Sequence, residues 1–481
     1  MKKASPSLRR RRAFAIISHM ASGIRLSDHF TFRKLIRFTL PPILMMLFTS
    51  IYWIVDGFFI SNYVGASAFA GVNLIFPVIM IVACVGFMFG SGGSALVSKK
   101  LGEKDNEGAS KTFSLITYSA LAVGIVLTIV FFFLVRPIAQ GFAAINSIQT
   151  TEEMIDQATT YGRIMIGGVF LYIMQGYFHP FFSANEKAEL GFVFTLASGL
   201  LNMLLDYLLV GLGGLGVVGA ASASLSGMLV SSLGPFLYFR FAKGNLIRLG
   251  KAAWSIREIL EAIVNGSSEF VANVSGSVVT IAFNIQLLKY IGEEGVSAYG
   301  IIAYVCFVFF AIFIGYSVGV SPIVGYNYGA KNKEELTNVL RKSLVIILVV
   351  SLVMTSLSFA LAEPITFIFA NNYPDLLALG TRAMRIYSFC YLFAGVSMFG
   401  SCFFTALSNG LISALISFCR TLVFQLSAVF LLPLIFGVDG IWYSIIFAEA
   451  MATIMTVVFI LAKSKKYGYR LFPERKTSPN P

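Results

Sequence analysis

Long apolar segments separated by short polar links constrain this chain more than any other feature of its sequence. About 20 apolar residues are enough for one helix to cross the hydrocarbon core of a bilayer. The links are too short to hold a soluble domain, so the sequence predicts an all-α membrane protein with twelve transmembrane helices. The expected helices span roughly residues 35–60, 68–97, 113–135, 159–182, 190–211, 216–240, 259–289, 296–326, 342–362, 382–406, 411–436 and 440–463.

The positive charge of the chain follows this predicted topology. Only 12% of the residues are charged, against about 25% in soluble domains, and the formal net charge is +13. Lys and Arg gather at both termini and in alternate loops, and cytoplasmic loops are the ones that carry such an excess. We therefore expect a multi-pass protein of the cytoplasmic (inner) membrane with both termini in the cytoplasm. Arg9–Arg12 would belong to a basic arm near anionic lipid headgroups, and no nucleic-acid partner is expected.

An internal repeat divides the chain into two similar halves. The segment Gly90–Glu107 aligns without a gap on Ser317–Glu334, so that Gly102 meets Gly329. Each half then has six helices, and an even number keeps the halves in the same orientation, as in the parallel repeats of secondary transporters. We expect two pseudo-symmetric six-helix bundles. The predicted parts are a basic cytoplasmic N-terminal arm (1–34), an N-lobe (35–241), a cytoplasmic linker (242–258), a C-lobe (259–463) and a cytoplasmic C-terminal tail (464–481).

Two aspartates within predicted helices of the first half are candidates for an ion-binding site. A carboxylate at membrane depth costs about 3 kcal/mol on insertion scales, so it is seldom there for packing alone. Tyr52 lies one turn before Asp56, and Asn202 one turn before Asp206. Ser224 adds a hydroxyl, although the small residues around it also suit close helix packing. If the two carboxylates share a cavity, both cannot ionise cheaply, and the site would hold a proton or a hard monovalent cation. Alternatively, Asn202 and Asp206 only hydrogen-bond a neighbouring helix.

Three ionisable side chains of the second half lie within predicted helices, and two of them allow two interpretations. Glu269 lies where we expect the start of the seventh helix, and it either caps that helix or acts as a gate or substrate contact. Glu449 lies deeper and is a candidate for contact with a cation or substrate. Arg420 either pairs with a carboxylate or extends its long side chain to the interface. The five cysteines show no metal or disulfide spacing, and we expect no metal site and no cofactor.

Several segments, in their order and spacing, resemble the multidrug and toxic compound extrusion (MATE) exporters, most nearly their bacterial MepA-like branch. The resemblance covers residues 35–463. It implies a cation-coupled antiporter with two six-helix lobes that expels chemically varied, often cationic and aromatic compounds. The segments that carry it are LPPILMMLFTSIYWIVDGFFI, GSGGSALVSKKLGEKD, LLNMLLDYLLV, GLGVVGAASAS, VSAYGIIAYV, SPIVGYNYGAKNK and IWYSIIFAEA.

The resemblance also implies an ion site in the N-lobe, residue by residue. The family's helix 1 aspartate and the tyrosine before it correspond to Asp56 and Tyr52, and the proline at which that helix can bend corresponds to Pro41. The match departs in helix 7, where many relatives carry a glutamate at a position near Ser275, whereas this chain has Glu269 nearer the start. The remaining matches are Asn202 and Asp206 for the Asn-x-x-x-Asp of helix 5, and Ser224 at a position where many members have threonine.

The sequence therefore favours a proton- or sodium-driven exporter of small organic cations that acts as a monomer in the lipid bilayer and is not an enzyme. A lipid-linked oligosaccharide flippase of the same wider superfamily is the alternative. Such flippases usually have a cavity rich in Arg and Lys, and this chain has almost no basic residues in its predicted membrane interior. A membrane-embedded transferase would need clustered His or Asp-rich motifs, which the sequence lacks.

Overall fold

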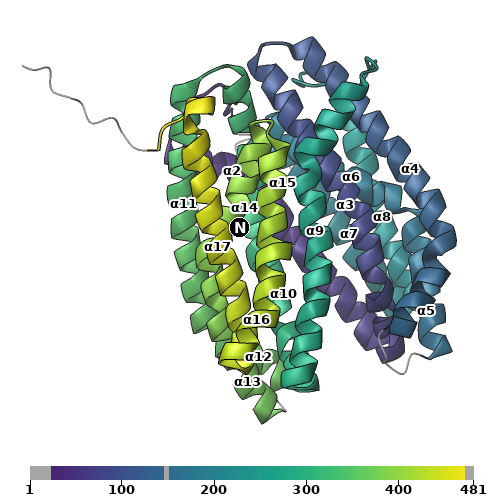
Figure 1. The fold of residues 1–481 in the computed structure, drawn as a ribbon. Coiled ribbons are helices and arrows are strands. Elements are labelled where there is room, and N and C mark those ends of the chain that lie inside the picture. Colours follow the sequence, from purple (N-terminus) through teal and green to yellow (C-terminus); the bar gives the residue numbers. More distant parts are fainter. Residues whose placement is uncertain (1–22, 146–150, 372, 472–481) are drawn as a thin grey trace, which may run out of the picture.

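The structure is a computed structural model that describes residues 23–145, 151–371 and 373–471. Every regular element within these residues is a helix. Eleven helical segments among them are long and apolar enough to cross a membrane, and the bent pair α5 (Glu152–Gly167) and α6 (Val169–Ala184) would make a twelfth. Within the described residues the chain is thus an all-α membrane protein with eleven or, counting the bent pair, twelve candidate transmembrane helices. Figure 1 shows them arranged in two bundles. The predicted basic stretch Arg9–Arg12 and the last ten residues lie outside the described residues.

The helices follow the predicted order, and most extend beyond their expected ends. The ninth expected helix begins at Lys333 instead of residue 342, because the side chain of Asn332 caps it by accepting from the amide of Glu335. The first bundle, the N-lobe, contains α2 (Phe32–Phe59), α3 (Ala66–Gly102), α4 (Asn106–Ile145), α5, α6, α7 (Ala188–Leu205) and α8 (Gly216–Phe241). The second, the C-lobe, contains α9 (Ile256–Tyr290), α10 (Glu293–Gly329), α11 (Lys333–Ala360), α12 (Ala362–Ala370), α13 (Pro374–Tyr387), α14 (Tyr391–Ala406), α15 (Gly410–Phe418), α16 (Leu426–Phe436) and α17 (Val438–Tyr467).

Irregular backbone occurs where candidate polar residues lie. α5 and α6 meet at Gly168 with a bend of 54°. The described residues contain three π-helical stretches: Ile60–Val64 follows α2, Asp206–Leu212 follows α7, and Cys419–Gln425 joins α15 to α16. Such stretches are rare in proteins overall, but many of those that occur lie at functional sites. Asp206 and Arg420 both lie within them, so both side chains project from places where regular helical hydrogen bonding is interrupted.

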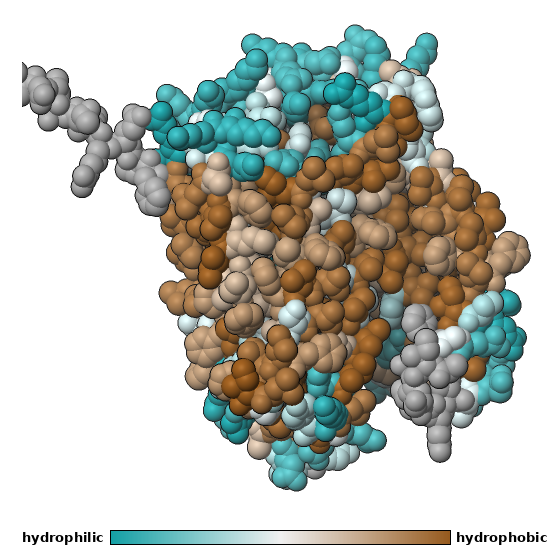
Figure 2. Space-filling model, in the orientation of Figure 1, coloured by the Kyte–Doolittle hydropathy of each residue, from teal (hydrophilic) through white to brown (hydrophobic). Residues whose placement is uncertain are grey.

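The surface of the molecule is that of a protein embedded in lipid. Figure 2 shows a belt of apolar residues between two polar ends. Large apolar side chains are exposed along most of the helices, which suits contact with lipid tails. One polar end is formed by the start of α2, the α3–α4 turn and the α10–α11 turn, and we call it the basic end. Its lysines include Lys99, Lys100, Lys104, Lys331 and Lys333.

Close backbone contacts join the two lobes at the basic end. A Cβ atom added to Gly102 would overlap the carbonyl oxygen of Tyr326, and one added to Gly329 would overlap that of Lys99. Positions 102 and 329 are 227 residues apart, as are positions 99 and 326. The two contacts are therefore equivalent under the internal repeat. In Figure 1 the lobes converge at this upper end and diverge toward the lower one.

Candidate functional site

The predicted polar residues of the N-lobe come together from three helices. The Ser224 hydroxyl on α8 donates to Asp56 Oδ1 on α2 at 3.2 Å, and Asn202 Nδ2 on α7 donates to Ser224 Oγ at 3.4 Å. Asn202 and Asp206 both lie close enough to Asp56 to interact with its carboxylate electrostatically. Tyr52 lies one turn from Asp56 on the same helix. Apart from the apolar ring of Tyr52, the cluster consists of oxygen and amide groups.

This cluster is almost completely buried and short of hydrogen-bond donors. Asp206 is 0% exposed, and Asp56, Asn202 and Ser224 are each at most 3% exposed. Within the described residues, both carboxylate oxygens of Asp206 and Oδ1 of Asn202 have no hydrogen-bond partner. A buried carboxylate oxygen without a donor costs several kcal/mol unless a proton or cation satisfies it. The arrangement can therefore accept a proton on Asp206, or surround a small cation with carboxylate, amide and hydroxyl oxygens.

Two further side chains belong to this region, and sequence reasoning missed both. Tyr161 on α5 is buried, its hydroxyl has no hydrogen-bond partner among the described residues, and it interacts electrostatically with both aspartates. Gln175 on α6 is buried and lies close enough to Tyr52 to interact with it electrostatically. Both lie on the two halves of the bent span. No pattern in the sequence marks them, because Tyr and Gln in an apolar helix are compatible with many environments.

The helix that carries Asp56 contains an adjacent proline pair. Pro41 and Pro42 lie inside α2, which remains one helix from Phe32 to Phe59. Each proline lacks the N–H that would bond the carbonyl four residues earlier, so two successive rungs of the helix are missing. The Thr39 hydroxyl donates to the carbonyl oxygen of Leu35 at 2.9 Å beside this gap. Pro41 is thus placed where a hinge would need to be, between the start of α2 and its carboxylate.

In the C-lobe, the structure pairs Glu449 with Arg420. Nε of Arg420 lies 2.8 Å and 2.9 Å from the two carboxylate oxygens of Glu449, and the Ser397 hydroxyl donates to Oε2 at 2.9 Å. The Arg420 guanidinium also lies 5.9 Å from the ring centroid of Phe310. Pairing with a carboxylate was one of the two interpretations of Arg420, and it is confirmed. Glu449 is therefore a neutralised carboxylate in this conformation.

Glu269 lies deeper in its helix than the sequence suggested. α9 begins at Ile256, where the Ser255 side chain caps it by accepting from the amide of Glu258. The interpretation of Glu269 as a helix cap is therefore wrong, because the helix dipole acts only within the first turn. Arg420 is near enough to interact electrostatically with Glu269. Asn273 and Thr280, which are exposed, follow Glu269 on the same face of α9, so this face presents a polar stripe.

The comparisons with known proteins decide the family. The model of the MatE family matches residues 41–208 and 270–431, which is about two thirds of the chain and includes most of the N-lobe cluster. The chain belongs to the MatE family. The two matched segments begin within α2 and α9, the first helices of the two lobes, which agrees with the internal repeat.

Relatives of this MatE protein match along nearly the whole chain. It is 24% identical to the multidrug export protein MepA of Staphylococcus saprophyticus over 434 residues, which cover 89% of this chain and 94% of that protein. The MepA of Staphylococcus aureus strain MW2 is 23% identical over the same shares. A solved structure described as the outward-facing conformation of a MATE multidrug resistance transporter aligns with a TM-score of 0.86 at 22% identity, covering 93% and 99% of the two chains. A MATE crystal structure in a bent conformation aligns with a TM-score of 0.81 at 21% identity, covering 94% and 99%.

Proposed function

We propose that this protein is a multidrug exporter that exchanges small organic cations for protons or sodium ions across the cytoplasmic membrane. The observation that carries the coupling is the buried, donor-poor cluster around Asp56 and Asp206. Two carboxylates in one buried cavity repel each other, so a proton or cation there lowers the energy of the site by a large amount. Ion binding and release at this cluster can therefore change the relative stability of two conformations of the lobes.

The export of several drugs is supported by the MepA relatives, which are named multidrug export proteins. An organic cation would bind between the lobes against the polar stripe of α9. There Glu269 supplies a carboxylate whose nearest cation, Arg420, is already bound to Glu449. A cationic aromatic compound would combine attraction to Glu269 with contact to the aromatic side chains of the C-lobe.

The expected exchange follows from competition between the ion and the drug. With the N-lobe acids charged, the interior is more negative and favours the organic cation. When a proton or sodium ion occupies the Asp56–Asp206 cluster, this attraction falls and α2 can change its shape at Pro41. The basic end would face the cytoplasm, because cytoplasmic loops carry the excess of Lys and Arg. We expect the monomer to be the working unit.

The proposal is tested by transport with the purified protein in proteoliposomes. A fluorescent organic cation should be exchanged against an imposed proton or sodium gradient, and Asp56→Asn should reduce the exchange at least about tenfold. Asp375→Asn, which removes an exposed carboxylate at the start of α13, is the matched control and should leave the exchange unchanged. Replacing sodium with choline at fixed pH distinguishes the two ions. Full exchange by folded Asp56→Asn would contradict the proposed site.

A further inference from the structure

The segment just before α2 is bound to the opposite lobe. We call residues 23–31 the strap. The carboxylate of Glu335, in the first turn of α11, uses both of its oxygens on the strap: Oε2 lies 2.6 Å from His29 Nδ1, and Oε1 accepts from the amide of Phe30 at 2.9 Å. Glu335 is buried, with 6% of its surface exposed. A buried carboxylate with several donors is a strong fixed point, because hydrogen bonds to charged groups are about twice as strong as neutral ones.

Further bonds to the C-lobe hold the strap backbone at the same place. The carbonyl oxygen of Phe30 accepts from Asn338 Nδ2 at 2.9 Å and from Lys342 Nζ at 2.6 Å. Asn338 also donates to Glu335 Oε1 at 2.7 Å. Three successive turns of α11 thus converge on the backbone of one strap residue, Phe30. The strap is therefore held by several specific hydrogen bonds and not by surface contact alone.

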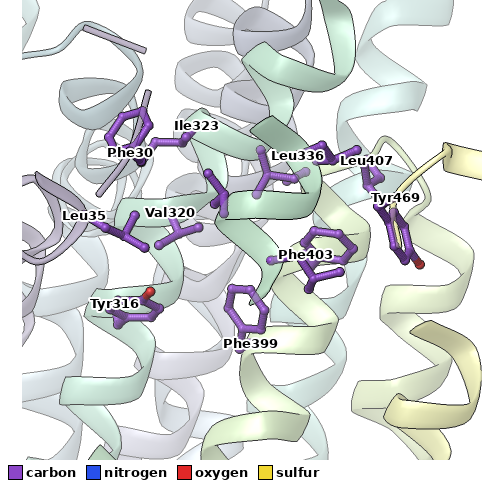
Figure 3. Close-up of a cluster of buried hydrophobic side chains, with 14 of the residues drawn as sticks. Phe30, Leu35, Tyr316, Val320, Ile323, Leu336, Phe399, Phe403, Leu407 and Tyr469 are labelled. Atoms are coloured by element: carbon purple, nitrogen blue, oxygen red, sulfur yellow. The ribbon is translucent and has the colours of Figure 1, made fainter. Parts of the chain in front are cut away.

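Apolar packing places the first turns of α2 in the C-lobe as well. Phe30 and Leu35 are fully buried in a cluster whose other members come almost entirely from the C-lobe. Figure 3 shows the two side chains beside Val320 and Ile323 of α10. The part of α2 beyond the prolines packs on α7 and carries Asp56 to the N-lobe cluster. Beyond the prolines α2 still contacts α10, where the Ser50 hydroxyl donates to the carbonyl oxygen of Phe307 at 3.5 Å. One helix therefore belongs to both lobes, and its contacts with the two lobes overlap along its length.

The start of the C-lobe shows the corresponding exchange in the opposite direction. Glu258, in the first turn of α9, forms an ion pair at 2.6 Å with Lys100 of α3 and accepts from the Thr112 hydroxyl of α4 at 2.6 Å. Ile259 of α9 is part of an apolar cluster of the N-lobe. Each lobe thus holds the start of the other lobe's first helix at the basic end.

The strap meets the N-lobe through a different kind of contact. The Leu26 amide donates to Glu186 Oε1 at 2.6 Å, in the turn between α6 and α7. Burial raises the pKa of Glu186, while this hydrogen bond and the neighbouring cations Arg25 and Lys187 oppose the shift and Asp28 adds to it. A cavity of about 530 Å³ lies beside this contact. The attachment of the strap to the N-lobe therefore includes a hydrogen bond to a partly desolvated carboxylate beside open space.

We propose that Glu335 is a positioning residue that keeps the start of α2 attached to the C-lobe throughout the transport cycle. With that end fixed, a change in α2 caused by an ion at Asp56 must move the C-lobe relative to the N-lobe. Without Glu335, the start of α2 would be held to the C-lobe only by its packing on α10, and the same change would move the strap more and the C-lobe less. The inference rests on the proposed function, because it assigns the route by which the ion acts on the drug site.

The first test compares Glu335→Ala with Glu334→Ala. Both substitutions remove a carboxylate from the first turn of α11, but Glu334 is exposed and does not contact the strap. The measured quantity is the ratio of the dissociation constants of a fluorescent organic cation with and without saturating ion (low pH or sodium). Linked sites commonly change each other's affinity by about 5- to 150-fold. We expect the wild type and Glu334→Ala to show such a ratio, and Glu335→Ala to show a ratio near one, with its affinity for the ion changed by less than about threefold.

The outcomes separate the two proposals. A wild-type ratio of one contradicts the proposed ion-coupled function itself. A wild-type ratio above about fivefold that persists in Glu335→Ala contradicts the positioning role and leaves the function intact.

Cross-linking provides a second test that does not depend on the folding of Glu335→Ala. In a protein whose five native cysteines are replaced by alanine, a short thiol-specific cross-linker is applied to two pairs. Phe32→Cys with Lys342→Cys ties the start of α2 to the C-lobe, where the Lys342 ammonium lies 5.7 Å from the Phe32 ring centroid. Leu26→Cys with Glu186→Cys ties the strap to the N-lobe. We expect transport to continue with the first cross-link and to stop with the second. Loss of transport with the first cross-link would show that the start of α2 must leave the C-lobe, and would overturn the proposal.

Discussion

The buried ion pair of the C-lobe provides the most quantitative prediction. Removing one of its two charges should reduce the stability of the protein much more than removing both. Glu449 is 2% exposed and the Arg420 side chain 15% exposed, so neither charge is well solvated. Removing one partner of such a pair leaves an uncompensated buried charge, which costs about 3–5 kcal/mol. Replacing both partners with apolar residues of similar size is often neutral or even stabilising.

We therefore expect Glu449→Leu and Arg420→Met each to lower the free energy of unfolding by about 3–5 kcal/mol, and the double substitution to lower it by less than about 2 kcal/mol. The coupling energy of this cycle would be several kcal/mol. Ser397→Ala should cost about 1.5–3 kcal/mol, since it removes one hydrogen bond to the charged Glu449. Unfolding in mixed micelles can be followed by the fluorescence of Trp442, which is buried on the same helix as Glu449.

A second ion pair provides the matched control. Arg382 and Asp439 also join two helices of the C-lobe, but their side chains are 69% and 26% exposed. The corresponding cycle should give a coupling energy below about 1 kcal/mol, because solvent screens exposed pairs. A coupling energy below about 1 kcal/mol for Arg420 and Glu449 would mean that the effects of the two single substitutions simply add. That result would refute the view that each of these buried charges is stabilised by the other.

Three further perturbations test other parts of the structure. Gly329→Ala places a Cβ against the carbonyl oxygen of Lys99, so spin-label distances between the lobes should increase at the basic end, and unchanged distances would contradict the close contact. Burial raises the pKa of Glu186 in the folded protein, so the folded state binds this proton more tightly than the unfolded chain; the stability that this group contributes should be greatest at low pH and should be lost as the pH rises through the raised pKa, as the same unfolding assay can measure. In Glu186→Gln this pH dependence should disappear. Asn265→Ala leaves the buried amide of Gly410 without its 2.9 Å acceptor and should cost about 1–3 kcal/mol in the same unfolding assay, whereas no change would show that another group accepts from this amide.

The helices were predictable because the length of each apolar segment indicates whether it can cross the bilayer. The ends of the helices were harder to predict. α11 starts nine residues before the expected 342, since its first turns are polar and lie at the basic end, where apolar length gives no signal. The misplacement of Glu269 has a different cause: its helix was expected from residue 259, close to the observed start at Ile256, so residue 269 already lay well inside the predicted helix. The irregular stretches were not predicted either, because their side chains resemble those of regular apolar helices.

The candidate site was predictable where the sequence carries costly residues. Asp56 and Asp206 stand out in apolar segments, and the family resemblance supplied Ser224 as a partner, which the structure places in contact with Asp56. Tyr161 could not be found in this way, because its position depends on the bend at Gly168. The role of Glu335 was equally hidden, since its partners His29 and Phe30 lie more than 300 residues away in the sequence.

The paired glycine contacts at the basic end have a consequence for how such a chain can change over time. Gly102 against Tyr326 and Gly329 against Lys99 form an interface in which each side presents the same surface, as in a two-fold symmetric dimer. In a dimer of identical six-helix chains, every substitution would appear twice. In a single fused chain, one copy can acquire a carboxylate while the other does not, and here position 283, which corresponds to Asp56, is phenylalanine. A single chain can thus keep the symmetric contact while its two halves differ at the position of Asp56.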